Sequence, residues 1–227
     1  MSTYATINLE AVEHLPDGAL LRLEGVSWDE YEKLLEELVE WPGVRVSYDQ
    51  GRVEIMSPTA EHEEYKDFVY SMARVLSEES RIRVETRGST TYKRERLLKG
   101  AEPDASIYVQ NALAIIGKRR IDLSVDPPPD IVVEIDITSE SLSKFPIYAA
   151  LGMPEIWRYD SKRARFYHLE DQDYAEALTS RSFPFLTAEA MTEFIEQSKA
   201  VGQYDALAAF RRWVRAALEA WADADES

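Results

Sequence analysis

The sequence predicts a mixed α/β fold, in which a central mixed β-sheet is flanked by helices and extra helices follow at the C-terminal end. Short runs of alternating or β-branched apolar residues indicate strands. Stretches with apolar residues at a spacing near 3.6 indicate helices at both ends of the sheet. The 227 residues, 45% of them hydrophobic, suit a folded domain with an appendage rather than a disordered chain.

The N-terminal part is predicted to form a helix, a hairpin and a second helix. Ser27-Trp28-Asp29-Glu30 is a capping box that opens the first helix, and Pro42-Gly43 stops it. The hairpin joins strands 44–48 and 52–56 through Asp49-Gln50-Gly51. Ser57-Pro58-Thr59 then opens the second helix, whose apolar residues recur with a helical period up to Leu76.

The remainder is predicted to alternate strands with short helices. A helix over 144–151 ends at Gly152, a residue suited to a left-handed C-cap. The predicted domain comprises residues 1–186, and residues 187–227 form a helical extension packed on the same domain. The further strands are expected at 82–86, 90–93, 105–109, 131–138, 155–159 and 165–169.

The composition excludes several classes of protein. Without cysteine there is no disulfide, thiolate zinc site, iron–sulfur cluster or cysteine nucleophile. No segment approaches the roughly 18 consecutive apolar residues of a membrane helix. The first twenty residues contain three acids and no apolar block, so no signal peptide is expected, and a cytoplasmic protein is predicted. Gly-rich phosphate loops, HExxH and GxSxG are absent.

The charge is unevenly distributed along the chain. A net charge of −16 argues against loose binding to nucleic acid, which depends on neutralising phosphates. Residues 81–120 nevertheless hold ten basic and four acidic side chains. This segment is either a solvated hairpin or a surface for phosphate groups.

The run 131–137 carries the strongest local signal for a site. Strand side chains alternate, so four apolar residues share one face, and Glu134 and Asp136 share the other. They are either solvated acids or a cation site. The strand leads into a helix, and its acids lie at its carboxyl end, where open α/β sheets bind ligands. Two adjacent carboxylates repel unless a cation or protons compensate, and a hard divalent ion is a natural partner.

Three other positions are candidates for the same site. Asp104 opens a strand after Pro103. It is a candidate for the site only if that strand lies beside the strand of Glu134. Lys144 lies at a helix N-terminus, where a cation opposes the helix dipole, so it is either a surface lysine or is directed at the carboxylates. Glu61, on the apolar side of the second helix, either caps it or ligates a metal.

In this order, Asp104, Glu134, Asp136 and Lys144, with Glu61 upstream, resemble the PD-(D/E)XK nuclease superfamily. Within it the chain resembles the Uma-two family of predicted endonucleases over about residues 20–215. The resemblance rests on Met56-Ser57-Pro58, Glu61-His62, Gly100-Ala101-Glu102-Pro103-Asp104, Val132-Val133-Glu134-Ile135, Lys144-Phe145-Pro146-Ile147-Tyr148 and the segment 152–160.

This resemblance implies a restriction-endonuclease-like sheet, a divalent metal site and hydrolysis of DNA phosphodiesters. Asp104 and Glu134, with a carbonyl near Ile135, are expected to bind Mg²⁺ or Mn²⁺, and Glu61 adds either an outer contact or a contact to a second metal. The superfamily places its lysine two residues after the glutamate, where this chain has Asp136. Lys144 is therefore expected to take over, orienting or deprotonating a water, while Asp136 is either a further metal ligand or a partner of Lys144.

Two further expectations concern partners. Lys93, Arg94, Arg96 and Lys99, together with His62, are expected to contact DNA. A homodimer is expected because nucleases of this fold often pair and because the last helix keeps an apolar stripe, which alternatively packs on its own sheet. The competing functional hypothesis is a non-catalytic member of the fold that binds protein or DNA, and the net charge and Asp136 favour it.

Overall fold

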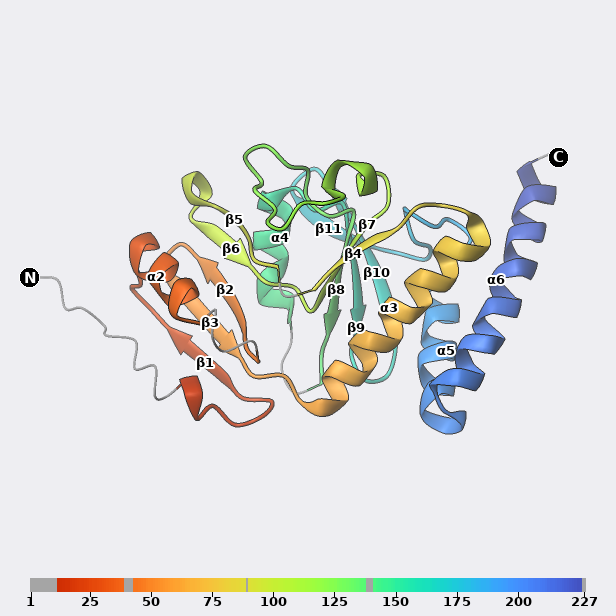
Figure 1. The fold of residues 1–227 in the computed structure, drawn as a ribbon, viewed down its shortest axis with the longest axis horizontal. Coiled ribbons are helices and arrows are strands. Elements are labelled where there is room, and N and C mark those ends of the chain that lie inside the picture. Colours follow the sequence, from red (N-terminus) through yellow and green to blue (C-terminus); the bar gives the residue numbers. More distant parts are fainter. Residues whose placement is uncertain (1–11, 39–42, 89, 138–140, 226–227) are drawn as a thin grey trace, which may run out of the picture.

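Two β-sheets lie side by side in the computed structural model, which describes residues 12–38, 43–88, 90–137 and 141–225 (Figure 1). One sheet has five strands and the other has six. Four of the helices belong mainly to the six-stranded sheet, and α2 belongs to the five-stranded sheet.

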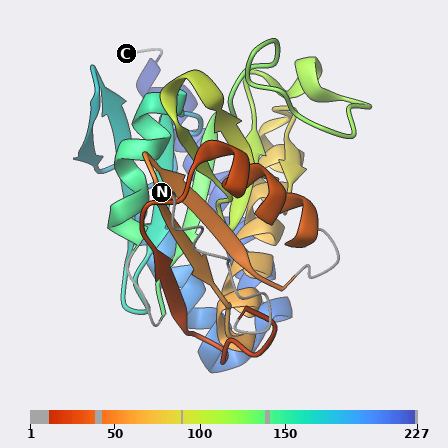
Figure 2. The same ribbon diagram turned by 90° about the vertical axis from the view of Figure 1, so that its left-hand side faces the viewer.

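The five-stranded sheet is antiparallel throughout and has the order β1-β3-β2-β6-β5. Helix α2 (Trp28–Leu38) covers one face, with Tyr31 and Leu34 buried against apolar residues of β2 and β3. Figure 2 views the molecule from this side and shows α2 lying across the strands. The strands are β1 (Leu20–Leu23), β2 (Arg45–Asp49), β3 (Arg52–Met56), β5 (Tyr92–Arg94) and β6 (Lys99–Ala101).

The six-stranded sheet is mixed and has the order β11-β10-β9-β8-β7-β4. Its one parallel pair, β8 with β9, is joined by a crossover through the 3₁₀ turn η3 (Ser141–Lys144) and helix α4 (Phe145–Leu151). Strand β8 is therefore interior, with β7 antiparallel on its other side. The strands are β4 (Glu85–Arg87), β7 (Ala105–Tyr108), β8 (Ile131–Ile135), β9 (Glu155–Tyr159), β10 (Ala164–Glu170) and β11 (Asp173–Ala177).

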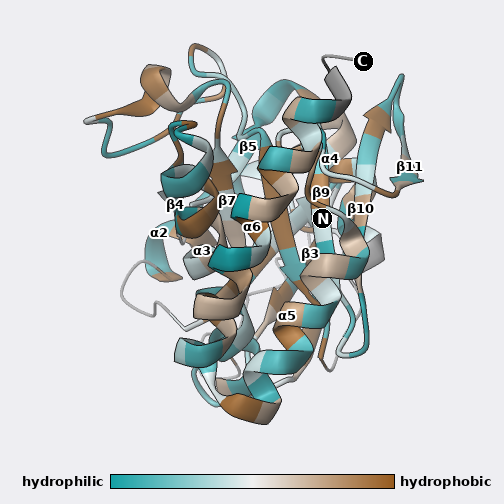
Figure 3. Cartoon of the chain, turned by 90° about the vertical axis from the view of Figure 1, so that its right-hand side faces the viewer, coloured by the Kyte–Doolittle hydropathy of each residue, from teal (hydrophilic) through white to brown (hydrophobic). Residues whose placement is uncertain are grey.

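Helices cover both faces of this sheet. Helices α3 (Ala60–Ser80), α5 (Ala188–Val201) and α6 (Gln203–Asp225) pack together on one face, and their apolar residues share a core with β7 to β10 (Figures 1 and 3). On the other face α4 shares a second core with β8, β9 and residues of β5 and β6. This second core joins the two sheets. Short 3₁₀ turns, η1 (Glu95–Leu97) and η2 (Ala112–Ile115), lie in the connections.

The predicted fold class is confirmed, with corrections to its elements. The expected central mixed sheet is the six-stranded one, and the five-stranded sheet is an addition that the sequence did not predict. Three short strands, β1, β6 and β11, were also not predicted. Strand 82–86 begins only at Glu85, and strand 131–138 ends at Ile135, with Thr138 outside the described residues.

The apolar stripe of the last helix packs within the chain. Phe210 and Val214 are fully buried, and Leu207 and Leu218 pack against the same core. Only Trp221 at the end of the stripe is largely exposed. Apart from Trp221, the stripe is therefore used inside the chain and not at a homodimer interface. In the part of the chain that the structure describes, no helix is both long enough and apolar enough to cross a membrane.

Candidate active site

Asp104 and Glu134 meet on neighbouring strands. The register pairs Ala105 with Val133, which sets Asp104, just before β7, opposite Glu134 on β8. The Ile135 N–H donates to Asp104 Oδ2 at 2.7 Å. Both side chains are only 1% exposed. The strand that Asp104 opens therefore lies beside the strand of Glu134, as its place in the site requires.

Glu134 is held by two donors from the crossover that follows its strand. Lys144 Nζ donates to Oε2 at 2.7 Å, and the Tyr148 hydroxyl makes a short hydrogen bond to Oε1. Lys144 is the N-cap residue of α4, and Pro146 in the first turn fixes the helix start there. Tyr148 lies one turn further on the same helix face. Lys144 thus points back at the preceding strand, while Tyr148 is a contact that the sequence analysis missed.

Burial and mutual repulsion control protonation in this cluster. Burial, aided by the nearby charge of Asp104, raises the pKa of Glu134 to about 7, although Lys144 opposes the shift. Burial alone would raise the pKa of Asp104, but His62, Lys144 and the Ile135 N–H lower it overall. Burial disfavours the charged form of Lys144, yet the two carboxylates hold its pKa above the usual value. Lys144 is therefore a cation at neutral pH.

Asp136 lies at the same strand end but has a different partner. Arg158 Nε donates to its Oδ2 at 2.6 Å, in a largely buried ion pair. Asp136 also lines the small hollow beside Asp104 and Glu134, and its charge helps to raise the pKa of Lys144. Its expected role as a metal ligand stays a prediction. In the structure its carboxylate is bound by Arg158.

The first turn of α3 brings His62 rather than Glu61 to the cluster. Glu61 is exposed and accepts a hydrogen bond from Tyr65 at 2.7 Å. His62 is buried, and its Nε2 lies 3.0 Å from Asp104 Oδ2, without the alignment of a hydrogen bond. Thr59 caps the helix and fixes this orientation by accepting the His62 N–H. His62 is therefore part of the buried cluster, and the DNA contact expected of it stays a prediction.

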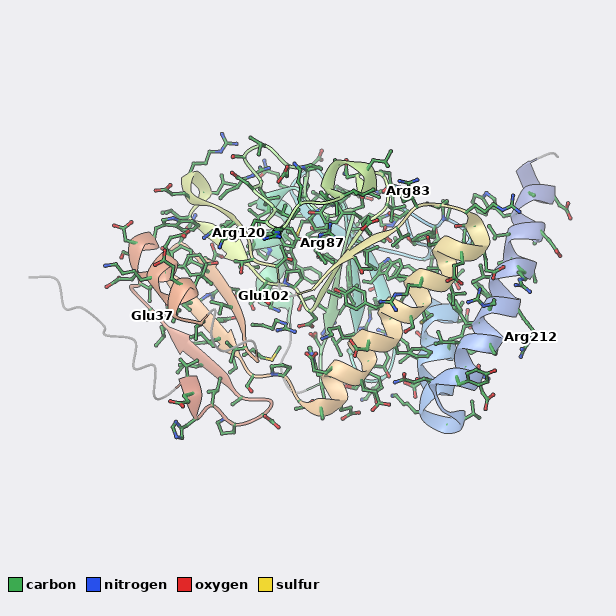
Figure 4. All side chains as sticks on the ribbon, viewed as in Figure 1. Glu37, Arg83, Arg87, Glu102, Arg120 and Arg212 are labelled. Atoms are coloured by element: carbon green, nitrogen blue, oxygen red, sulfur yellow. The ribbon has the colours of Figure 1, made fainter. Side chains whose placement is uncertain are left out.

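The five-stranded sheet supplies the opposite wall of the site. Arg45 of β2 is 4% exposed and lies near three carboxylates, those of Glu63, Glu102 and Asp104. Glu102, labelled in Figure 4, lies between the two sheets. The hollow has a volume of about 20 Å³, room for one water-sized group. Its walls are formed by Leu20, Arg45, Ser47, Glu54, Met56, Asp104, Glu134, Ile135, Asp136 and Lys144.

Two of the four expected DNA-binding cations are paired with acids. Lys93 contacts Glu32 at 2.5 Å, and Lys99 contacts Asp49 at 2.5 Å. Arg94 donates to the Leu123 carbonyl at 3.2 Å, and Arg96 is exposed. The basic segment is therefore partly neutralised. Arg87 and Arg120, labelled in Figure 4, belong to the same segment.

A divalent cation needs oxygen ligands, and the buried cluster offers the carboxylates of Asp104 and Glu134. Within the described residues, no group of three or more His, Asp or Glu side chains has a geometry suited to a metal. Asp104 Oδ1 is buried and has no hydrogen-bond partner, whereas each oxygen of Glu134 has one. The chemistry of the two carboxylates fits an ion that prefers oxygen ligands. The site therefore fits a two-carboxylate metal site rather than a three-acid one.

Fold and site together define a mixed α/β protein with a buried acid pair and a lysine from the following helix. A family model, that of Uma2, described as "Putative restriction endonuclease", matches residues 28–196. The chain belongs to this family, as its sequence predicted, and the restriction-endonuclease-like assignment agrees with it.

A solved structure is similar to this chain. A crystal structure of a "putative nuclease" from Anabaena variabilis is 17% identical and has a TM-score of 0.49. The similar region covers 71% of this chain and 98% of the chain of that nuclease. A search of curated proteins found no match.

Proposed function

We propose that this protein is a metal-dependent endonuclease that hydrolyses DNA phosphodiester bonds. The observation that carries the proposal is the pairing of Asp104 and Glu134 on adjacent strands, with Lys144 directed at them. Membership of a family described as restriction endonucleases supports DNA as the substrate. The reaction adds water across one ester bond: the water oxygen bonds to phosphorus, a P–O bond breaks, and the leaving oxygen takes up a proton.

Asp104 and Glu134 would hold Mg²⁺ or Mn²⁺. Such an ion lowers the pKa of a bound water and neutralises charge on the phosphate. Lys144 is better suited to donate hydrogen bonds than to accept a proton, because the two carboxylates keep it charged. We therefore assign it the stabilisation of charge on the reacting phosphate. Glu134, whose pKa is near 7 without the ion, would have to release its proton in order to hold the ion.

One observation favours the non-catalytic alternative. Lys144 and Tyr148 already occupy both oxygens of Glu134, and Arg45 and Lys144 balance the buried acids without a metal. A member of the fold that had lost its metal could keep this arrangement as an ion-pair network. Metal affinity separates the two functions, since only the nuclease needs it.

Plasmid cleavage with Mg²⁺ or Mn²⁺ tests the proposal. We expect the wild type to nick or linearise plasmid DNA, and Asp104→Ala to lose at least about 100-fold in rate together with its metal affinity. Lys144→Ala should lose turnover but keep most of its metal affinity, as measured by calorimetry. Asp67→Ala, which removes an exposed acid of α3, is the matched control. Equal metal affinity in wild type and Asp104→Ala would favour the non-catalytic function.

We further propose that Arg94 and Arg96 contact the DNA, that the protein is cytoplasmic and that it forms a homodimer. The location is proposed from the lack of cysteine in the sequence, because disulfides are typical of oxidising compartments. The dimer depends on analogy with other nucleases of this fold, because the stripe of α6 is used inside the chain.

A further inference from the structure

Arg45 is a buried cation that the proposed reaction leaves without a role. It lies on β2, in the other sheet from Asp104 and Glu134, and lines the same hollow as both. Burying a guanidinium destabilises the fold unless its donors are satisfied. A buried arginine with incomplete pairing therefore calls for an explanation.

The pairing of Arg45 is incomplete. Nη2 donates to Glu63 at 3.2 Å, while Nη1 is 3.6 Å from Glu102 and 3.4 Å from the Val44 carbonyl. Nε is buried and has no hydrogen-bond partner, and it lies 4.0 Å from Asp104 Oδ1. That Asp104 oxygen also has no hydrogen-bond partner. An unsatisfied donor and an unsatisfied acceptor thus lie on the walls of one hollow.

The hollow has the size and the cations for one oxygen of an anionic group. Its volume of about 20 Å³ admits a single oxygen-sized group. Arg45 and Lys144 place positive charge in its walls beside four carboxylates, of which Glu54 is paired with Arg22 and Asp136 with Arg158. Guanidinium groups bind phosphate oxygens through directed N–H donors, which a lysine ammonium does not reproduce. The rest of a phosphate would stay at the mouth of the hollow.

We propose that Arg45 is a catalytic residue that binds the scissile phosphate, its Nε–H donating to one non-bridging oxygen. This inference rests on the proposed phosphodiester hydrolysis. It makes the site a product of both sheets: the six-stranded sheet supplies the carboxylates and Lys144, and the five-stranded sheet supplies the phosphate donor. A purely structural Arg45 would balance the charge of Glu63, Glu102 and Asp104 and would not touch the substrate.

The test measures cleavage of a short duplex in which one non-bridging oxygen at the cleaved phosphate is replaced by sulfur, each stereoisomer separately. Sulfur accepts hydrogen bonds poorly, and Mn²⁺ serves as the metal because it accepts sulfur more readily than Mg²⁺. We expect one isomer to be cleaved more slowly than the oxygen substrate by the wild type. In Arg45→Lys the oxygen substrate should slow by about 100-fold and the sulfur effect should vanish.

Arg45→Lys keeps the charge beside the three acids, which favours folding, and circular dichroism checks it. Arg52→Lys, in the same hairpin and partly exposed, is the matched control and should keep the wild-type sulfur effect. An unchanged sulfur effect in Arg45→Lys overturns the role of Arg45 alone. Equal cleavage of both isomers by the wild type also overturns the role of Arg45, and this result needs no variant. If the wild type does not cleave the oxygen substrate, the proposed function fails and the role of Arg45 fails with it.

Discussion

Glu134 combines deep burial with two hydrogen-bond donors and a nearby like charge. Its pKa near 7 means that the folded chain retains a proton that the unfolded chain, with a pKa of 4.5, has released. Between these two values unfolding releases this proton, so a rise in pH favours unfolding. The contribution of Glu134 to stability is thus present below pH 4.5 and is lost as the pH rises to about 7.

Glu134→Gln removes this titration while keeping the shape of the side chain. We expect the variant to gain stability relative to the wild type between pH 5 and pH 8, by on the order of 2 kcal/mol. Urea unfolding of both proteins at the two pH values measures the change. The attraction between Lys144 and the charged Glu134 carboxylate already contributes to this pKa, so the comparison includes it. Parallel stability curves would contradict the raised pKa.

The sequence predicted the residues of the site unevenly. Alternation in 131–137 places Glu134 opposite the apolar face, and Pro146 places Lys144 at a helix start; both are local signals, and the structure agrees with them. Alternation also sets Arg45 and Ser47 on one face of β2. Whether that face meets water or a second sheet depends on pairing between distant segments. No local pattern could therefore identify Arg45 as part of the site.

The sequence predicted the boundaries of an element well where local signals, such as a helix cap, specify that element. Helices with caps, such as α3 behind Thr59 and α5 behind Thr187, begin where the sequence predicted. Strands β1, β6 and β11 are three to five residues long, and β1 and β11 lie at sheet edges. Such short strands are held by their neighbours rather than by their own pattern. Their existence depends on sheet pairing, which a single sequence does not reveal.

The contact between α2 and β6 depends on Gly100. A Cβ at this position would clash with the hydroxyl of Tyr31 and crowd its ring at 3.1 Å. Gly100→Ala should lower the free energy of unfolding by about 1–3 kcal/mol, because overpacking forces the helix from the strand. Urea denaturation followed by circular dichroism measures this loss.

Tyr31→Phe tests the cause of that loss. The Tyr31 hydroxyl is buried without a hydrogen-bond partner, so its removal alone should cost little. In the double variant the alanine has more room, and part of the stability should return. If Tyr31→Phe restores nothing, the clash is not the reason for the glycine.

On the scale of the whole molecule, the C-terminal helices complete the main core. Met191, Phe194 and Ile195 of α5, with Phe210 and Val214 of α6, are at most 4% exposed. They belong to the same cluster as the buried residues of α3 and of strands β7 to β10. Glu79 of α3 also pairs with Arg211 and Arg215 of α6. The predicted boundary at residue 186 therefore separates segments that share one core.

A chain truncated after residue 186 should fail to fold cooperatively. It would expose the apolar face of α3 and of the six-stranded sheet. The lost burial of five large side chains, at about 2–5 kcal/mol each, amounts to about 10–25 kcal/mol, against the roughly 5–15 kcal/mol by which domains are typically stable. We expect no sigmoidal thermal transition by circular dichroism. Truncation after residue 222 is the control, because α6 is exposed over residues 219–223 and the loss of its end should leave the transition in place. A sharp transition in the shorter chain would instead make residues 187–227 a dispensable extension, with the nuclease fold complete without them.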